Sequence, residues 1–239
     1  MKDKVVLIVG GTGGIGNATA ELFSKAGCKV VIAGRDKNKA DQIAAKINDD
    51  GGDAYSINVD VTDHASVSEM AREINQNLGS IDILINAFGR GLIQPILDIN
   101  PVDAKEIFDV NVYGSFLVTQ TVMRYMTEQK SGSIVMFPGT MGKYIMKNSS
   151  GYAASKFALT GFTKALTEEA KRTGIKFSLL HLGGVATPFW DDDRVNMRVK
   201  KEAMLSTEEV AKAVYYAVNQ PDGSVLNEVV IQPESHQLV

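Results

Sequence analysis

The sequence predicts an α/β domain in which a doubly wound parallel β-sheet carries helices on both faces. Two observations lead to this prediction. Short apolar runs rich in β-branched residues alternate with longer segments of helical periodicity, a pattern typical of βαβ units. Crossovers between parallel strands are almost always right-handed, which favours the doubly wound arrangement. No internal repeat and no Pro- or Ser-rich linker interrupts the chain, so we expect one domain over residues 1–239.

Seven segments are expected to form strands because each is short and apolar: Val5–Val9, Lys29–Ala33, Ala54–Val59, Ile81–Ile85, Ser133–Phe137, Lys176–His181 and Glu228–Gln232. The expected helices lie between them: Asn17–Ala26, Lys37–Asp50, Ser66–Leu78, Ala104–Gln129 and Tyr152–Thr173. The stretch 187–205 has the least regular pattern. It is either a substrate lid at the carboxyl ends of the strands or an ordinary connecting loop.

Composition excludes several other classes of protein. The net charge of −3 lacks the basic excess of nucleic-acid-binding domains. No apolar run approaches the roughly 20 residues that span a bilayer. Cys28 is the only cysteine, which excludes an intramolecular disulfide and favours a cytoplasmic protein. We expect no metal site, because no His or Cys cluster is present and Asp191–Asp193 is better interpreted as a solvated helix or loop start than as a calcium site.

A glycine-rich segment, Gly10–Gly16, directly follows the first expected strand and opens a helix. In that context glycines let the backbone approach a pyrophosphate, which the helix N-terminus then holds. The alternative is a glycine-rich turn without a ligand. The second strand ends in Arg35 and not in the carboxylate that would bind the ribose of NAD. Arg35, supported by Thr12 and Lys37, therefore predicts NADP(H); the alternative for Arg35 is a solvated surface charge.

Tyr152 and Lys156 are spaced i and i+4, which puts them on one face of a helix. A nearby cation favours the phenolate and lowers the pKa of a tyrosine. Tyr152 could then give a proton to a carbonyl oxygen while a nicotinamide delivers hydride to the carbon.

With the glycine loop upstream, this pair makes the chain resemble the short-chain dehydrogenase/reductase family over essentially its whole length. The resemblance implies a Rossmann-type domain with a seven-stranded parallel sheet, a small-molecule carbonyl or alcohol substrate, and a homodimer or homotetramer. It implies that Tyr152 is the catalytic acid and base, that Lys156 tunes it, and that Asn111 completes a proton relay. Together with the residue-level argument, it predicts these cofactor-binding residues: Gly10, Thr12, Gly14, Ile15, Gly16, Arg35, Asp60, Val61, Asn86, Gly89, Tyr152, Lys156, Val185 and Thr187.

Gly139 is the main departure from the family pattern, because it occupies the position of the family's catalytic serine. Losing such a hydrogen-bond donor typically costs about 10²–10³ in rate. Thr140 is the nearest hydroxyl, but it would face the other way in an extended segment unless Gly139 bends the chain; Ser149 and Ser150 are weaker substitutes. Two functions therefore stay open. The chain is an NADP(H)-dependent oxidoreductase, or it is an NADP(H)-binding sensor or inactive partner in a hetero-oligomer.

The pocket mouth implied by the resemblance has two further features. Arg90, Lys143 and Arg194 are candidates for holding an acidic substrate. Phe189, Trp190 and Met197 either line an apolar pocket or pack in the core.

Overall fold

The computed structural model describes residues 1–235 and 237. Within this part of the chain, seven parallel strands form one sheet in the order β3-β2-β1-β4-β5-β6-β7. The predicted doubly wound, Rossmann-type fold is confirmed, and the strands agree with the expected segments to within two residues at each end. Their bounds are β1 Val5–Val9, β2 Lys29–Gly34, β3 Asp53–Asn58, β4 Ile83–Asn86, β5 Gly132–Met136, β6 Ile175–Leu182 and β7 Glu228–Ile231.

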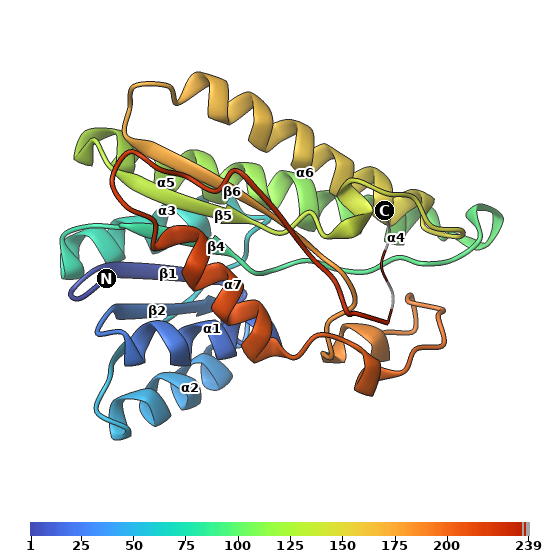
Figure 1. Cartoon of the computed structure of the whole chain (residues 1–239), viewed down its shortest axis with the longest axis horizontal. Helices are drawn as coiled ribbons and strands as arrows, with labels where there is room; N and C mark the ends of the chain where they lie inside the picture. Colours follow the sequence, from blue (N-terminus) through green and yellow to red (C-terminus); the bar gives the residue numbers. More distant parts are fainter. Residues whose placement is uncertain (236, 238–239) are drawn as a thin grey trace.

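Helices cover both faces of the sheet (Figure 1). One face packs against α1 (Gly14–Lys25), α2 (Lys37–Asp49) and α7 (Thr207–Val218). The other packs against α3 (His64–Leu78), α5 (Ser115–Gln129) and α6 (Ser150–Glu169). None of the helices in the described part of the chain is long and apolar enough to cross a membrane.

Strand β1 joins the two hydrophobic cores. All five of its residues are buried. Successive side chains point to opposite faces, so Leu7 and Val9 belong to one core and Val6 and Ile8 to the other. The strand pairs with β2 on one side and β4 on the other. The strand order reverses here, and this leaves a crevice at the carboxyl ends of β1 and β4, where ligands bind in folds of this type.

The helix expected over 104–129 is interrupted. The structure has α4 (Pro101–Phe108), a π-helical turn (Asp109–Gly114) and then α5. A π-helical turn inserts an extra residue and turns the side chains that it carries. Helix α7 was not among the expected segments. A capping box of Ser206 and Glu209 begins it, and the Ser-x-x-Glu spacing is the sequence signal that could have predicted it.

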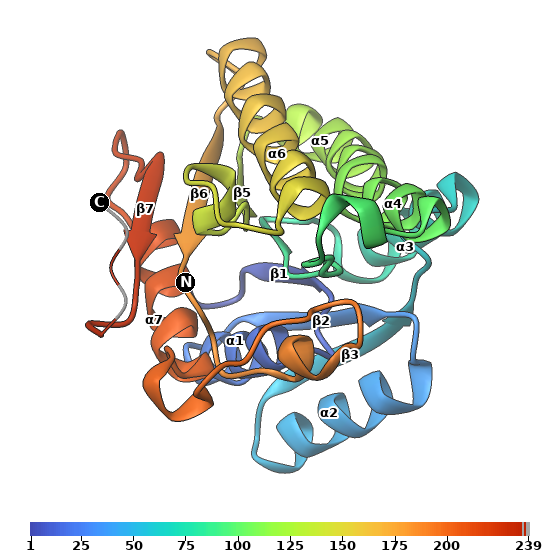
Figure 2. The same ribbon diagram turned by 90° about the vertical axis from the view of Figure 1, so that its right-hand side faces the viewer.

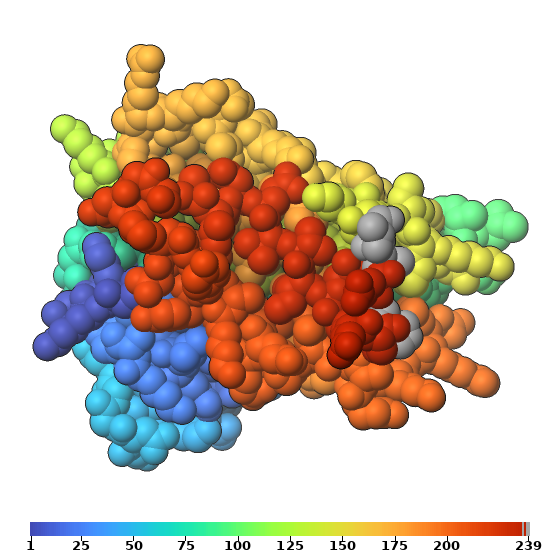
Figure 3. Space-filling model, in the orientation of Figure 1, coloured from blue at the N-terminus to red at the C-terminus, as the bar shows by residue number. Residues whose placement is uncertain are grey.

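The stretch 187–205 lies over the carboxyl end of the sheet. Figure 2 shows this segment, in orange, passing in front of the sheet. It contains two short 3₁₀ turns, Pro188–Asp191 and Lys201–Ala203. The hydroxyl of Ser235 donates to the carbonyl oxygen of Ala203 at 3.3 Å, and Figure 3 shows the orange and red segments meeting on this surface. We name residues 187–205 the lid segment after the sequence expectation; its role as a substrate lid stays a prediction.

Candidate active site

The glycine loop between β1 and α1 has the shape of an anion cradle. Gly10 has a φ of +84°, and a Cβ there would lie 2.7 Å from the backbone of Ala87, so no other residue fits. Helix α1 begins after Gly13 with no side-chain cap and no acidic residue in its first turn. Its first N–H groups therefore stay available for a negatively charged group. The predicted residues Gly14, Ile15 and Gly16 form this first turn.

The end of β2 lies beside this loop. A Cβ on Gly34 would be 3.2 Å from the hydroxyl of Thr12. Arg35 follows Gly34, is exposed, and forms no ion pair among the described residues. Lys37 is different, because its ammonium pairs with Asp41 and donates to Ser56 Oγ at 3.0 Å. Of the three predicted donors for a 2′-phosphate, Thr12 thus lies against Gly34, the residue before Arg35, while Lys37 is engaged with Asp41 and Ser56.

The remaining predicted cofactor residues line the same end of the sheet. Asp60 accepts hydrogen bonds from Thr62, which lower the pKa of the Asp60 carboxyl. Val61 is buried against Gly114. Asn86 is also buried; its Nδ2 donates to Thr119 at 3.2 Å, while its Oδ1 has no partner among the described residues.

Two segments far apart in the sequence meet at the start of α1. A Cβ on Gly14 would lie 3.1 Å from Thr187 Cγ2, so the start of α1 meets the start of the lid segment. The carbonyl oxygen of Val185 accepts a 2.8 Å hydrogen bond from the indole of Trp190. An uncapped helix start, a glycine-only approach and an unpaired buried oxygen together fit a dinucleotide in this crevice.

Asn111 sits in the π-helical turn with its amide held on both sides. Its Oδ1 accepts from the backbone N–H of Arg90 at 2.8 Å, and its Nδ2 donates to the carbonyl oxygen of Arg90 at 3.0 Å. The same Nδ2 lies 3.1 Å from Ser155 Oγ on α6. A Cβ on Gly89 would be 3.2 Å from Asn111 Oδ1 and 3.5 Å from Lys156 Nζ. Asn111, Gly89 and Lys156 therefore meet at one point.

Tyr152 and Lys156 share one face of α6, as predicted, with Lys156 Nζ 5.4 Å from the centre of the phenol ring. Lys156 is buried, its Nζ donates to the carbonyl oxygen of Phe137 at 2.9 Å, and desolvation lowers its pKa to about 8. Burial raises the pKa of Tyr152. The expected lowering of that pKa is not met in this structure, because desolvation outweighs the nearby cation. Phe189 of the lid segment covers the phenol, with ring centres 5.6 Å apart.

Gly139 bends the chain. This bend is the condition under which the sequence allows Thr140 to face the site. Its φ of +64° and ψ of 177° form a combination open essentially only to glycine. Its carbonyl oxygen lies 3.0 Å from Nδ1 of the buried His181, which therefore carries the proton on that nitrogen. Burial lowers the pKa of His181. The 3₁₀ turn Thr140–Gly142 follows at once and buries Thr140.

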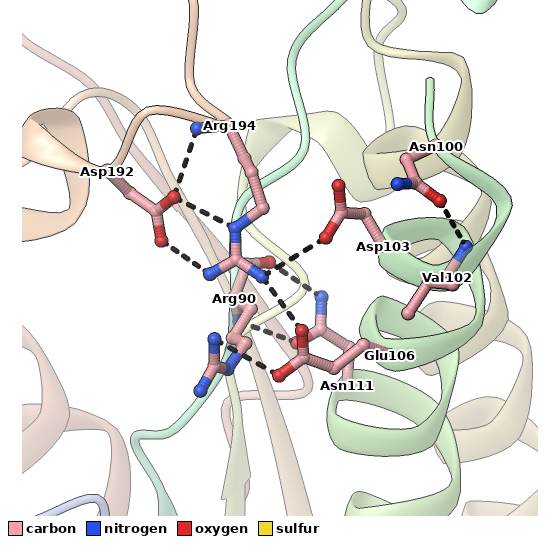
Figure 4. A network of polar contacts seen from close by, with 8 residues as sticks. All are labelled: Arg90, Asn100, Val102, Asp103, Glu106, Asn111, Asp192 and Arg194. Atoms are coloured by element: carbon pink, nitrogen blue, oxygen red, sulfur yellow. Dashed lines mark hydrogen bonds and ion pairs between the residues drawn. The ribbon is translucent and has the colours of Figure 1, made fainter.

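Ion pairs join the lid segment to α4 and to the segment after β4 (Figure 4). Arg194 binds Asp192 through Nε at 2.9 Å and Nη2 at 2.6 Å, which lowers the pKa of Asp192 to about 2. Glu106 of α4 accepts from Arg194 Nη1 at 2.9 Å and lies 3.1 Å from Arg90 Nη1. The backbone N–H of Ile93 also donates to the carbonyl oxygen of Arg194 at 2.8 Å.

The three cations considered for an acidic substrate are thus already paired. Arg90 and Arg194 share Glu106, and Lys143 Nζ lies 3.1 Å from Glu228. Among the described residues no group of three or more His, Cys, Asp or Glu side chains is arranged to hold a metal ion.

Glu106 and Ser155 were not singled out by the sequence. Glu106 meets Arg194, 88 residues away, and Ser155 meets Asn111, 44 residues away. Both are ordinary polar residues on helices, and a contact over such a separation leaves no periodicity or local spacing to detect.

Known proteins similar to this chain are oxidoreductases. The family model for short chain dehydrogenases matches residues 4–198. An uncharacterized oxidoreductase of Staphylococcus epidermidis is 33% identical over 233 residues, 98% of each chain. A metagenomic short-chain oxidoreductase in complex with NADP is 25% identical, with a TM-score of 0.84 over 98% of each chain. A 3-ketoacyl-(acyl-carrier-protein) reductase from Brucella melitensis, complexed with NADH, is 26% identical, with a TM-score of 0.86 over 98% of each chain.

The lowered pKa of Lys156 predicts a pH dependence of stability. Between pH 8 and 10 the unfolded chain, whose lysine pKa is near 10.4, binds more protons at this position than the folded chain. The free energy of unfolding therefore rises with pH in this window, by about 2 kcal/mol between a folded pKa of about 8 and the unfolded value. Urea titrations without nucleotide should give this gain for the wild type relative to Lys156→Met. Tyr152 does not contribute below pH 10, because its pKa is raised. A flat difference between the two proteins contradicts the prediction.

Gly139→Ser is expected to strain the turn. The added Cβ has room, since its nearest neighbour is the Leu182 carbonyl oxygen at 3.5 Å, but the backbone conformation disfavours any L residue by about 1–3 kcal/mol. Gly139→Ser and the hydroxyl-free control Gly139→Ala should both lose stability by that amount in thermal or urea unfolding. A serine variant as stable as the wild type would overturn this interpretation of the turn.

Proposed function

This chain belongs to the short-chain dehydrogenase family, and from that premise we propose that it is an NADP(H)-dependent oxidoreductase that interconverts a carbonyl and an alcohol on a small molecule. The observation that carries the proposal is the meeting of Asn111, Tyr152 and Lys156 beside the anion cradle of α1. A proton donor next to a dinucleotide site is the arrangement that hydride transfer to a carbonyl requires.

In this proposal residues at the carboxyl ends of the strands would hold the cofactor. Gly10, Gly14, Ile15 and Gly16 would hold its pyrophosphate through backbone N–H groups, and Thr12 and Arg35 would hold the 2′-phosphate. Asp60, Val61, Asn86 and Gly89 would hold the adenine and ribose, and Val185 and Thr187 the nicotinamide. When bound, the cofactor supplies or accepts the hydride.

Tyr152 Oη gives a proton to the carbonyl oxygen during reduction and takes one from the alcohol during oxidation. Lys156, with a pKa of about 8, is largely charged at neutral pH and favours the phenolate of Tyr152. It would also bind the ribose next to the nicotinamide. Arg90 and Ser155 hold the side chain of Asn111 in place. In this proposal Asn111 completes the proton relay that begins at Tyr152.

We assign the role of the family's catalytic serine to the Gly139 turn. His181 holds the carbonyl oxygen of Gly139, and Lys156 holds that of Phe137, so the turn is fixed at both ends. Thr140, through its hydroxyl or its backbone N–H, is the donor that we assign to the substrate carbonyl. A preorganised donor at this point stabilises the charge that develops on the carbonyl oxygen.

We also propose a cytoplasmic homodimer or homotetramer. Phe108, Tyr113 and Phe116 expose large apolar side chains along α4, the π-helical turn and α5. Phe157 does the same on α6. An exposed apolar surface of this kind is typical of a face that pairs with another subunit.

Arg35→Ala tests the choice of cofactor. Removing the guanidinium should weaken NADPH binding about 10–100-fold and leave NADH binding nearly unchanged, because only NADPH carries the 2′-phosphate. Fluorescence titration with both nucleotides measures the two dissociation constants. Lys37→Ala is the matched control and should have a smaller effect, since Lys37 is paired with Asp41. An unchanged preference in Arg35→Ala would refute the assignment.

Tyr152→Phe tests the reaction. The variant should bind NADPH as the wild type does but lose NADPH oxidation by at least about 100-fold on any carbonyl that the wild type reduces, because the proton donor is removed. Absorbance at 340 nm with a panel of aldehydes, ketones and diketones measures turnover. Intact NADPH binding with no turnover across the panel would favour the second function, an NADP(H)-binding sensor or inactive partner, for which the glycine at position 139 is the motivating observation.

A further inference from the structure

The charged side chains at the mouth of the site pair with one another, with one negative charge in excess. Arg90 and Arg194 face Glu106, Asp192 and, at 3.9 Å, Asp103. Figure 4 shows the two guanidinium groups on the same side of α4, with Glu106 between them. Two positive and three negative side chains give this cluster a net charge of −1. The Asp192 carboxyl stays ionised throughout the neutral range, since its pKa is about 2.

The cluster is fixed in place by backbone contacts as well as by charge. Arg90 is held through its own N–H and carbonyl groups by Asn111. The backbone at Arg194 is held by an isolated β-bridge between Ile93 and Val195. In this bridge the N–H of Asn196 donates to the Ile93 carbonyl oxygen at 3.0 Å. The guanidinium groups therefore cannot turn to a substrate anion without breaking ion pairs that are partly shielded from water.

The side chains that reach Tyr152 from the lid segment are apolar. Phe189 lies between Tyr152 and the backbone of Gly91, where an added Cβ would be 2.7 Å from Phe189 Cζ. Trp190 packs edge-to-face on Phe189, with ring centres 5.1 Å apart. Leu92 lies against Gly151, next to Tyr152 in the chain, at 3.0 Å from the position of its Cβ. A flat apolar group is the substrate part that such a surface accepts best.

We propose that the site selects uncharged carbonyl compounds that carry an aromatic or bulky apolar group next to the carbonyl, and that Glu106 is the residue that excludes carboxylates. The inference rests on the proposed function. Glu106 acts by neutralising Arg90 and Arg194, which would otherwise attract an acidic substrate. The Nε of Arg90 is buried without a partner among the described residues.

A matched pair of compounds tests this inference directly. Methyl benzoylformate and benzoylformate share the same ring and ketone, and at neutral pH they differ in charge. Trp190 is the only tryptophan of the chain and lies in the lid segment, so its fluorescence reports binding without any turnover. With NADP⁺ present, the ester should change the Trp190 emission in a saturable way and the acid should not. In NADPH oxidation, kcat/KM should favour the ester by about 100-fold, because the acid brings a negative charge to a negative cluster.

Glu106→Gln keeps the size of the side chain and removes its charge. The preference for the ester should fall about 10-fold through better use of the acid, since the cluster then has no net charge. Glu169→Gln, an exposed change at the end of α6, is the matched control and should leave the preference at the wild-type value. The inference is overturned if the wild type uses the acid as well as the ester, or if the preference in Glu106→Gln equals that of the wild type.

The two levels of proposal fail in different ways. If the ester changes the Trp190 emission but no carbonyl of any kind oxidises NADPH, the proposed function fails and the selectivity of the site stands. If another carbonyl oxidises NADPH while neither matched compound affects Trp190, the proposed function stands and this inference is overturned. Loss of NADPH binding altogether would overturn both.

Discussion

The burial of β1 on both faces is the constraint on which the rest of the structure depends. Every residue of this strand is enclosed, so its neighbours β2 and β4 must lie directly beside it and helices must cover both of its faces. Right-handed crossovers then lead the chain outward from β1 in one direction and from β4 in the other. The glycine loop after β1 and Gly89 after β4 thereby come to the same edge of the sheet, where the lid segment contacts Gly14 and Gly91.

The Gly139 turn is a feature of the site that depends on backbone conformation, which the residue type alone does not describe. Two buried groups hold it, Lys156 at the carbonyl oxygen of Phe137 and His181 at that of Gly139. Because His181 donates through Nδ1 whether it is neutral or protonated, this hydrogen bond does not depend on the charge of the ring. Lys156 contacts the same turn from α6, so the Gly139 turn and the helix that carries Tyr152 are held in a fixed position relative to each other.

Much of the fold could be predicted from the sequence, and less of the candidate site. Strands such as Val5–Val9 are recognisable because burial on both faces requires an unbroken apolar run, and the Tyr152–Lys156 pair because helix geometry fixes its spacing. The π-helical turn around Asn111 could not be predicted, since its residues also fit a regular helix. Glu106 was missed because its partners are set by tertiary packing. The partners of Lys37 and Arg194 were missed for the same reason, so both looked free in the sequence.

The lid segment and the Gly139 turn bear on the same chemical question. A carbonyl that reacts without the hydroxyl of a serine receives less polarisation from the protein. Phe189 packs on Tyr152 with ring centres 5.6 Å apart, so a donor beside the phenol acts next to apolar groups, in a medium of lower dielectric constant. The same apolar surroundings raise the energetic cost of an unpaired carboxylate, because Arg90 and Arg194 are already neutralised by Glu106 and Asp192. If the chain reduces carbonyls, reactivity and selectivity then have a common cause. Uncharged substrates whose carbonyl is activated by its own neighbouring groups need the least polarisation from the protein, and they meet no electrostatic repulsion from the charged side chains at the mouth of the site.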